Sequence, residues 1–422
     1  MSSRYAWPEW SGRVDRPYLL TSVPVASGGH SNVTVGSCGN DGPGLRSATA
    51  RIQGGDTTRA IHPWAAFGSA LALSLLLVGG EGLVAPPTTE AATSCRVRNV
   101  SQGTQGRSLK RMVRRSRDGD RLIMRGTCAG QVVIGTDIVI TGKGQRPTIS
   151  GWGKRRVVAV KPGARVVLRN LRVQRGRTDK GTAGGAGILN DGRLTIIGSR
   201  ISDNVARRRG GGGILNTQSG RLVVIGSTIS GNATRSHGGG INNEGTARIT
   251  TSTVKGNDSK RGGPAIETSS RGTFTLIDSV VSDNSGAGID VRCCRGQGAV
   301  RLVRTIVSDN SDAGIFVSDG SVTLRKTTVR GNTGGGIWVG GLSRVTLENS
   351  TVQGNSTSWK GGGISTYGRL VLRDSTVTAN TAAIEGGGIY AHLDSSRAQV
   401  TLEGSSSVHD NVPDDCVGTT AC

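Results

Sequence analysis

The chain has 422 residues, of which 68 are glycine and only 3% are aromatic, and its formal net charge at pH 7 is +23. So few large side chains exclude a conventional large core, and glycine without a triplet period excludes collagen. The charge favours anionic partners such as acidic polysaccharides, cell-wall polymers, nucleic acid or a membrane surface, unless it reflects only a bias toward arginine codons.

Residues 1–94 differ from the rest of the chain. Within them, residues 65–78 (AAFGSALALSLLLV) form an apolar run that is short for a membrane span, with Arg59 before it and small residues after it. This pattern predicts a secretory signal peptide that is cleaved between Ala85 and Cys95. The protein is then secreted or held at the cell surface, with no membrane segment after cleavage; the alternative is an uncleaved membrane anchor.

Six cysteines remain after this leader, which allows 15 pairings, but their positions suggest one scheme. An exported chain can form disulfides. We predict one disulfide at each end of the remaining chain, in the pairs Cys95–Cys128 and Cys416–Cys422. The other two, Cys293 and Cys294, are adjacent and form either a vicinal disulfide or two free thiols.

The segment 95–130 has the pattern of a cap followed by a first strand. Its stretch SLKRMVRRSRDGDRLIMRGTC, at 108–128, begins with a short amphipathic helix that places Leu109, Met112 and Val113 on one face. Asp-Gly-Asp then turns the chain into an apolar run. We expect this segment to cover the open edge of the first strands that follow.

A repeat fills the rest of the chain. An isoleucine follows each glycine cluster at intervals of 22 to 27 residues, which is the period of a solenoid. Each of these isoleucines is followed by an apolar-x-apolar pair, and then by a β-branched residue that lies three places before an asparagine. The three kinds of repeated position are expected to point inward, each as a column along the stack. The marker isoleucines are Ile188, Ile214, Ile241, Ile266, Ile289, Ile315, Ile337, Ile364 and Ile389.

Three short strands per turn of about 25 residues predict an all-β, single-domain parallel β-helix over residues 131–410, closed by a disulfide-bonded tail at 411–422. The crossover rule makes it right-handed. Repeated asparagines should form a ladder in which each side-chain amide bonds to the next coil, at turns with left-handed backbone. These are Asn204, Asn232, Asn257, Asn284, Asn310, Asn332, Asn355, Asn380 and Asn411.

The G-G-G-I and V-x-x-N repeats resemble the glycine-glycine and x-x-N repeats of polymorphic outer membrane proteins. More broadly, they resemble the pectate-lyase-like right-handed β-helix superfamily. The resemblance covers residues 95–422 and implies the fold rather than an activity, because the repeated residues are those that build the coil. The R-x-P-x-x-R segment of calcium-dependent pectate lyases and the N-T-D and D-D elements of polygalacturonases have no counterpart in the coils, so no catalytic residue carries over.

Loop length varies along the repeat and predicts a notch. In most coils the next marker isoleucine lies nine or ten residues after the ladder asparagine. After Asn284, Asn310 and Asn332 it lies only five residues later. Alternation points the residue after each marker isoleucine outward. The floor of the notch should therefore hold Asp290 and neighbouring aromatic residues.

Aromatic residues in and around this notch predict a surface that binds a linear, acidic polysaccharide. Flat rings spaced one coil apart suit stacking on sugar faces, and exposed rings are costly without a ligand. The alternative is that the rings cover neighbouring loop backbone. The predicted ligand-binding residues are Phe316, Trp338, Trp359, Tyr367 and Tyr390.

Catalysis is an open question in the sequence. Glu267 and Asp290 lie one coil apart, near the roughly 5 Å separation of retaining glycosidases, so they are the candidate acid and nucleophile of a lyase or hydrolase. Asp283 and Asp309, which lie in Ser-Asp-Asn triplets, are candidate ligands of a calcium ion, although aspartates in such triplets are more often solvated turn residues. No metal-binding spacing or other cofactor motif is present.

Two hypotheses follow from the sequence. The first is a secreted, carbohydrate-binding β-helix, monomeric and with or without lyase or hydrolase activity. The second is a non-catalytic adhesin or structural surface protein that binds anionic polymers by charge. The sequence has no RNA- or DNA-binding motif, so nucleic acid is not expected to be a specific partner. His237 and His392 are expected at the surface.

Overall fold

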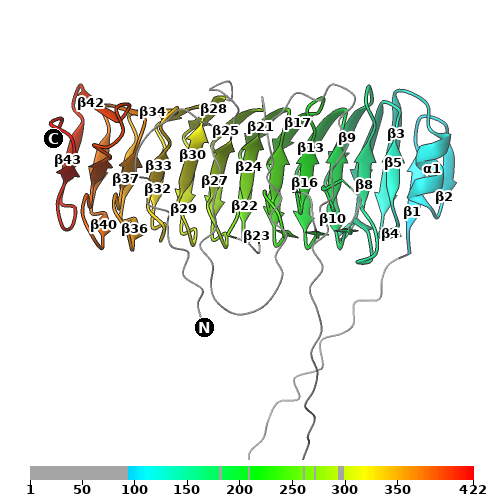
Figure 1. Ribbon diagram of the computed structural model, residues 1–422. Helices are drawn as coiled ribbons and strands as arrows, with labels where there is room; N and C mark the ends of the chain where they lie inside the picture. Colours follow the sequence, from blue (N-terminus) through cyan, green and yellow to red (C-terminus); the bar gives the residue numbers. More distant parts are fainter. Residues whose placement is uncertain (1–93, 180–182, 208–209, 260–261, 270–271, 293–298) are drawn as a thin grey trace, which may run out of the picture. The chain divides into compact units, whose positions relative to one another are not determined.

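The computed structural model describes residues 94–422 except for 180–182, 208–209, 260–261, 270–271 and 293–298. The described chain forms short strands that stack in successive coils, with one helix at the start of the stack (Figure 1). The predicted leader and cleavage site, and the adjacent cysteines Cys293 and Cys294, lie outside the described residues. None of the described helices is long and apolar enough to cross a membrane.

Three long sheets run along the stack, and each coil contributes one strand to each. Sheet 1 has 14 strands, which are parallel except for the pairings of β1. Its strands are, in stacking order, β2 (Thr104–Gly106), β1 (Arg96–Asn99), β3 (Asp120–Arg125), β6 (Ile138–Gly142), β9 (Arg165–Arg169), β13 (Arg193–Ile197), β17 (Arg221–Ile225), β21 (Thr246–Thr250), β25 (Thr273–Ile277), β28 (Ala299–Val303), β31 (Ser321–Arg325), β34 (Arg344–Glu348), β38 (Arg369–Arg373) and β42 (Gln399–Glu403).

Sheet 2 has 12 parallel strands of three residues each. Its strands are β4 (Thr127–Ala129), β7 (Thr148–Ser150), β10 (Arg172–Gln174), β14 (Arg200–Ser202), β18 (Thr228–Ser230), β22 (Thr253–Lys255), β26 (Val280–Ser282), β29 (Ile306–Ser308), β32 (Thr328–Arg330), β35 (Thr351–Gln353), β39 (Thr376–Thr378) and β43 (Ser407–His409).

Sheet 3 also has 12 strands and begins with the predicted marker isoleucine in most coils. Its strands are β5 (Val132–Ile134), β8 (Val158–Val160), β12 (Ile188–Asn190), β16 (Ile214–Asn216), β20 (Ile241–Asn243), β24 (Ile266–Ser269), β27 (Ile289–Arg292), β30 (Ile315–Asp319), β33 (Ile337–Val339), β37 (Ile364–Thr366), β41 (Ile389–Ala391) and β44 (Cys416–Val417). Shorter pairings join β11 (Arg177–Thr178), β15 (Val205–Ala206), β19 (Ala233–Thr234) and β23 (Asp258–Ser259), and join β36 (Ser356–Thr357) to β40 (Thr381–Ala382).

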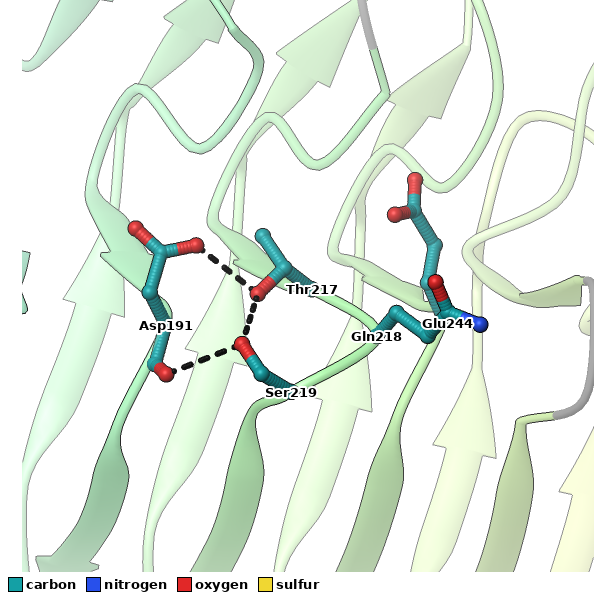
Figure 2. Close-up of a pocket in the computed structure, with 5 residues that line it drawn as sticks. All are labelled: Asp191, Thr217, Gln218, Ser219 and Glu244. Atoms are coloured by element: carbon teal, nitrogen blue, oxygen red, sulfur yellow. Dashed lines mark hydrogen bonds between the residues drawn. The ribbon is translucent and has the colours of Figure 1, made fainter. Parts of the chain in front are cut away.

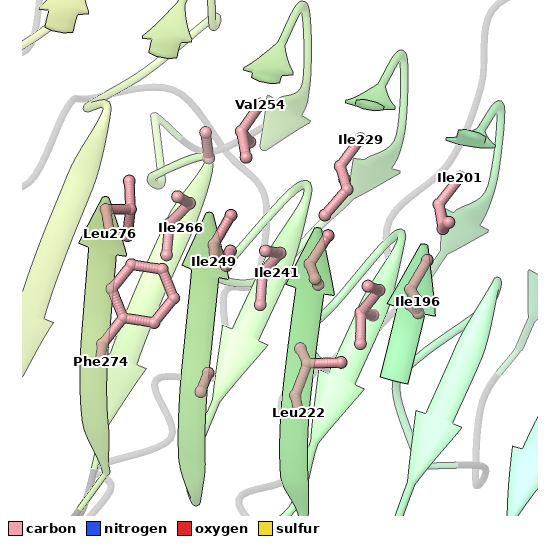
Figure 3. Packing of buried hydrophobic residues seen from close by; sticks show 14 of the residues in the cluster. Ile196, Ile201, Leu222, Ile229, Ile241, Ile249, Val254, Ile266, Phe274 and Leu276 are labelled. Atoms are coloured by element: carbon pink, nitrogen blue, oxygen red, sulfur yellow. The ribbon is translucent and has the colours of Figure 1, made fainter. Parts of the chain in front are cut away.

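The core lies inside the coils and consists of the predicted columns. Parallel pairing places Ile241 beside Ile266 and Leu222 beside Ala247, and these side chains are almost completely buried (Figure 3). Because every coil repeats the same registers, two apolar residues from each strand of sheet 1 and one from most strands of sheets 2 and 3 are enough to fill the interior. The prediction of a right-handed parallel β-helix is confirmed.

The predicted asparagine ladder is present at the turn after sheet 2. Each Nδ2 donates to the Oδ1 of the next asparagine at 2.8 to 3.1 Å, from Asn204 through Asn411. The residue before the ladder position takes left-handed backbone, with φ of 57° at Asp203 and 56° at both Asp283 and Asp309. Aspartate or glycine occupies this position in every coil except the one with Ala379, which has φ of 53°, because aspartate and glycine adopt that conformation at low cost.

Two further ladders were not predicted. Asn190 donates to Asn216, which donates to Asn243, at the end of sheet 3. A column of serine and threonine hydroxyls follows sheet 1, where the backbone N–H of one coil donates to the hydroxyl of the next, as from Ser199 to Ser227. Each turn of the coil therefore has side chains that bond along the stack and satisfy buried backbone groups.

The N-terminal cap matches the predicted helix but contains more than was predicted. Helix α1 (Leu109–Arg115) starts at Ser108, whose hydroxyl accepts from the backbone N–H of Arg111, and it buries Leu109, Met112 and Val113. Before the helix, β1 and β2 form an antiparallel hairpin that extends sheet 1. The structure contains both expected disulfides, Cys95–Cys128 and Cys416–Cys422. At the other end, β44 adds a last strand to sheet 3.

Candidate functional site

The residues predicted to line a notch lie in one column on the outer side of sheet 3. Parallel pairing places Glu267 beside Asp290, Asp290 beside Phe316, and Phe316 beside Trp338. Ser365 follows next to Trp338, and Tyr390 comes next. The sequence therefore predicted the order and common face of this column correctly, because the strand register fixes both.

The two carboxyl groups are buried, which corrects the expectation of an open notch floor. Glu267 is 5% exposed and Asp290 is 2% exposed. Neighbouring side chains cover them. Nδ1 of His237 lies 3.3 Å from Oε2 of Glu267, and Nε of Arg292 donates to Oδ2 of Asp290 at 2.6 Å. Strand alternation gives the side on which a residue lies, but it does not show which loop residues fold over it.

This carboxylate cluster contains several buried polar atoms that lack a hydrogen-bond partner among the described residues. They are Nδ1 of His237, Oδ1 of Asn242, Oε2 of Glu267 and Oδ1 of Asp290. Nδ1 of His237 and Oε2 of Glu267 lie 3.3 Å from each other, so these two atoms are in contact although their geometry is not that of a hydrogen bond. Buried polar groups are normally paired, which makes Oδ1 of Asn242 and Oδ1 of Asp290 the unusual atoms of this patch. The cluster spans three successive coils, since Asn242 pairs with Glu267 and Glu267 pairs with Asp290.

Burial sets the protonation of the cluster. It raises the pKa of Glu267 to about 8, with a further rise from Asp290 and an opposing effect of Arg292. Burial also raises the pKa of Asp290 to about 6, against the charge and hydrogen bond of Arg292. The pKa of His237 falls to about 4 because the ring is partly buried and Arg292 is near. Between pH 6 and 8 the cluster thus holds a neutral Glu267 beside an ionised Asp290.

The predicted aromatic residues stack on one another. The rings of Phe316 and Trp338 are 4.2 Å apart and within 3° of parallel, and Trp338 lies 5.7 Å from Tyr367. Stacking at this distance means that Phe316 and Trp338 cover each other's facing surfaces, so a sugar could reach only their outer faces or edges. From the sequence, flat rings spaced one coil apart were expected to offer their faces to sugars. That expectation did not account for ring-to-ring contact between neighbouring coils.

The stack continues to the last coils through a histidine. Tyr367 stacks on His392 at 3.5 Å, and Tyr390 meets His392 edge-on at 4.5 Å. His392 is only 8% exposed, and its Nε2 lies 3.1 Å from the hydroxyl of Ser365, so its expected surface position is wrong. Lys360 bonds to the hydroxyl of Tyr390 at 2.9 Å.

The remaining predicted positions are more dispersed. Trp359 is half-buried in the segment before β37, where its backbone N–H donates to the hydroxyl of Thr357. Asp283 and Asp309 are exposed turn residues, and the hydroxyl of Ser282 donates to Asp283. The described residues contain no group of three or more His, Cys, Asp or Glu side chains placed to hold a metal ion.

The outer side of sheet 1 carries a charge pattern that the sequence analysis missed. Fourteen arginines and two glutamates point outward from its strands, and every one of these arginines is exposed. We call these arginines the arginine face. They are Arg96, Arg98, Arg121, Arg125, Arg165, Arg169, Arg193, Arg221, Arg248, Arg301, Arg325, Arg344, Arg369 and Arg373.

Several of these arginines lie directly beside one another. Parallel register places Arg193 between Arg165 and Arg221, and Arg344 beside Arg369. Within the described chain, Arg373 is the one member of the arginine face with an ion pair, and it contacts both outward glutamates of the sheet. The signal was present in the sequence, because an arginine often directly precedes the first residue of the apolar-x-apolar pair.

A hollow lies at the turn that leads into this face. Its volume is about 500 Å³, and three successive coils line it with polar side chains: Asp191, Thr217, Gln218, Ser219 and Glu244. The hydroxyl of Thr217 donates to Asp191, and that of Ser219 donates to the backbone oxygen of Asp191 (Figure 2). Arg193 and Arg221 follow two residues after Asp191 and Ser219, so the hollow borders the arginine face.

Comparison with family models supports the architecture. The model for the right handed beta helix region matches residues 145–293 and 293–420, well over half of the chain. The chain belongs to this family. Neither the curated proteins nor the solved structures gave a match to this β-helix protein. Membership of the right handed beta helix family establishes the coil, and the site must be argued from this chain's own residues.

One more feature of the β-helix protein escaped the sequence analysis. Trp152 is 50% exposed, with left-handed backbone at φ 54°, in the turn between β7 and β8. It lines a second hollow together with Ala129, Gly130, Gly151, Lys154 and Arg155. The sequence signal is a tryptophan between two glycines, Gly151 and Gly153, in a coil whose repeat is irregular.

Proposed function

We propose that this protein is a secreted or cell-surface β-helix that binds a linear acidic polysaccharide along the arginine face. The observation that carries this proposal is that the outer side of sheet 1 has fourteen arginines but only two glutamates. Strands within a sheet are about 4.8 Å apart, so in-register arginines such as Arg165, Arg193 and Arg221 repeat a positive charge at that interval.

An external anion would make this arrangement of arginines more favourable. Like charges directly opposite one another on a sheet destabilise it. Within the described chain, no acidic side chain forms an ion pair with Arg165, Arg193 or Arg221. A polymer that lies along the stack and places an anionic group near each coil would relieve this repulsion. The charge also increases the rate at which such a polymer meets the protein.

A polysaccharide fits this face better than a single-stranded nucleic acid. Proteins that bind single strands without sequence preference combine a basic groove with aromatic rings on which the bases stack. The residues between the arginines on the outer side of sheet 1 are mainly threonine, valine and isoleucine, and the phenylalanine of this sheet, Phe274, points into the core. The polar hollow beside Arg193 and Arg221 offers hydroxyl and carboxylate partners for sugar hydroxyls.

The test is binding of fluorescently labelled polymannuronate, hyaluronate and heparin, with neutral dextran as the reference glycan. Replacing Arg193 and Arg221 by alanine should weaken binding of the acidic polymers about tenfold, since each exposed arginine contact contributes about 0.5 to 1 kcal/mol. The matched control replaces Arg172 and Arg200, which are paired in the same way on sheet 2. Raised ionic strength should weaken binding of every acidic polymer.

Equal losses for the two pairs of substitutions would show that net charge, and not the arginine face, binds the polymer. Binding of dextran as tight as that of polymannuronate would contradict the proposal altogether. In either case the alternative of a rigid structural coil without this site would be preferred.

Glycoside hydrolysis at Glu267 and Asp290 is a second candidate, favoured by one observation. The two carboxyl groups lie on adjacent coils with pKa values near 8 and near 6, which separates a proton donor from a carboxylate at neutral pH. Because both groups are buried, a substrate would have to displace the cover around His237. The assay is shortening of polymannuronate and hyaluronate over time; cleavage that Asp290→Asn does not remove would place the chemistry elsewhere.

A further inference from the structure

The hollow around Trp152 is separate from the arginine face, because it lies at the turn between sheets 2 and 3. Trp152 forms one wall, Ala129 and Gly130 contribute small residues, and Lys154 and Arg155 add two positive charges. The volume of the hollow is about 410 Å³. Both cations are exposed, and neither forms an ion pair with a described residue.

Trp152 is held in an unfavourable conformation that keeps its ring accessible. A bulky residue with φ of 54° is an outlier, because its Cβ crowds the following carbonyl oxygen. The ring is nevertheless 50% exposed, so little apolar burial offsets this cost. Strain of this kind persists where the surrounding structure enforces it and is concentrated at binding sites.

The turn that carries Trp152 is fixed by hydrogen bonds on both sides. Gly151 donates to the oxygen of Gln174 at 3.0 Å, and Gly153 donates to the oxygen of Arg175 at 2.6 Å. The N–H of Trp152 donates to the hydroxyl of Ser150 at 3.2 Å. Any side chain at Gly151 would collide with neighbouring backbone, since a Cβ there would lie 2.3 Å from the oxygen of Arg155. The indole is therefore presented by a preorganised turn.

We infer that this hollow binds one acidic sugar unit, with its ring against the indole of Trp152 and its anionic group near Lys154 and Arg155. An indole face takes the apolar C–H face of a pyranose, and two cations beside it select an anionic substituent. A nucleotide is a poorer fit because none of the described residues that line the hollow has a carboxylate or amide side chain to bond a base edge. The inference goes beyond the proposed function, since it concerns a different face and a much shorter ligand.

The test measures by calorimetry how tightly the protein binds mannuronate trisaccharide, a short acidic ligand. Neutral mannotriose and adenosine monophosphate are the reference ligands. Trp152→Ala should weaken trisaccharide binding at least tenfold, whereas Trp152→Phe should stay within about threefold of the unchanged protein. Leu342→Ala is the matched control, because Leu342 is an equally exposed apolar residue (51%) outside the hollow, and it should leave trisaccharide binding unchanged. Exchanging Lys154 and Arg155 for glutamine should reduce the preference for the acidic over the neutral trisaccharide.

A stability measurement separates a binding role from a structural one. Trp152→Asn should abolish trisaccharide binding while leaving the thermal midpoint unchanged or higher, because asparagine accepts left-handed backbone. A lower midpoint, unchanged trisaccharide binding in Trp152→Ala, or tighter binding of adenosine monophosphate would overturn the inference. The Trp152→Ala comparison is repeated in the variant with alanine at Arg193 and Arg221, where the same loss of at least tenfold should be seen, so failure here and failure of the proposed function give different results.

Discussion

The asparagine ladder allows a stability prediction whose size follows from its contacts. Asn310→Ala removes two hydrogen bonds accepted from Asn284, at 3.2 and 2.8 Å, and two donated to Val281 and Asn332, at 3.4 and 2.9 Å. At about 1 kcal/mol for each net bond, the loss is about 4 kcal/mol. The backbone N–H of Asn284 would also be left buried without its partner.

The measurement is urea unfolding, followed by circular dichroism and by hydrogen exchange at the N–H of Asn284. Two probes are needed because stacked repeats can unfold in parts. Asn242→Ala is the matched control, because Asn242 is 8% exposed and has no hydrogen bond with any described side chain or backbone group. It should cost about 1 kcal/mol or less, in the ordinary range for such changes. Equal losses for the two variants would refute the view that the ladder bonds hold adjacent coils together.

Three further predictions concern other parts of the coil. Since burial raises the pKa of Glu267 to about 8, its stabilising effect is complete below its ordinary pKa and is lost as pH rises through 8. Between pH 6.5 and 8 the unchanged protein should lose about 1.4 kcal/mol per pH unit relative to Glu267→Gln, measured by urea midpoints, and parallel curves would contradict this. Exchanging Cys95 and Cys128 for serine should cost about 3 to 4 kcal/mol, seen as a lower thermal midpoint; an unchanged midpoint would contradict this. Trp338→Ala should cost about 1 to 3 kcal/mol, because the ring is only partly buried, and it should remove the near-ultraviolet signal of its stack with Phe316; an unchanged signal would show that the rings do not stack in solution.

The sequence was sufficient to predict the coil because the fold repeats one rule. Each marker isoleucine, apolar pair and ladder asparagine recurs at the same place in every coil, so a pattern seen in many turns defines the position of each member. The helix that buries Leu109, Met112 and Val113 was also predictable, because its periodicity is local. The hairpin of β1 and β2 was not, because β1 has a single apolar residue, Val97, and β2 has none, so neither strand shows an apolar pattern in the sequence.

The candidate site was less predictable because it depends on contacts between neighbouring coils. Alternation put Glu267 and Asp290 on the outer side of sheet 3, but it does not place His237, whose position in the segment before β20 depends on loop conformation. Arg292 ends β27 two residues after Asp290, so alternation does place it on the same face, where its Nε donates to Asp290. The ring-to-ring stack of Phe316 and Trp338 similarly depends on side-chain rotamers. The spacing of apolar residues predicts which side chains share a column. It does not predict how the side chains in that column cover one another, which depends on the three-dimensional structure.

The arginine face shows why a parallel β-helix suits a repetitive anionic ligand. Parallel register stacks each residue directly on its counterpart, so an arginine kept at one position, as in Arg165, Arg193 and Arg221, becomes a row of like charges about 4.8 Å apart. Two such charges in water repel by about 1 kcal/mol when their guanidinium groups approach to 4 Å. The asparagine and apolar columns supply the stability that tolerates this cost. A polymer with anionic groups along its length removes the same repulsion in each coil that it covers, so its binding energy should increase with the number of coils in contact.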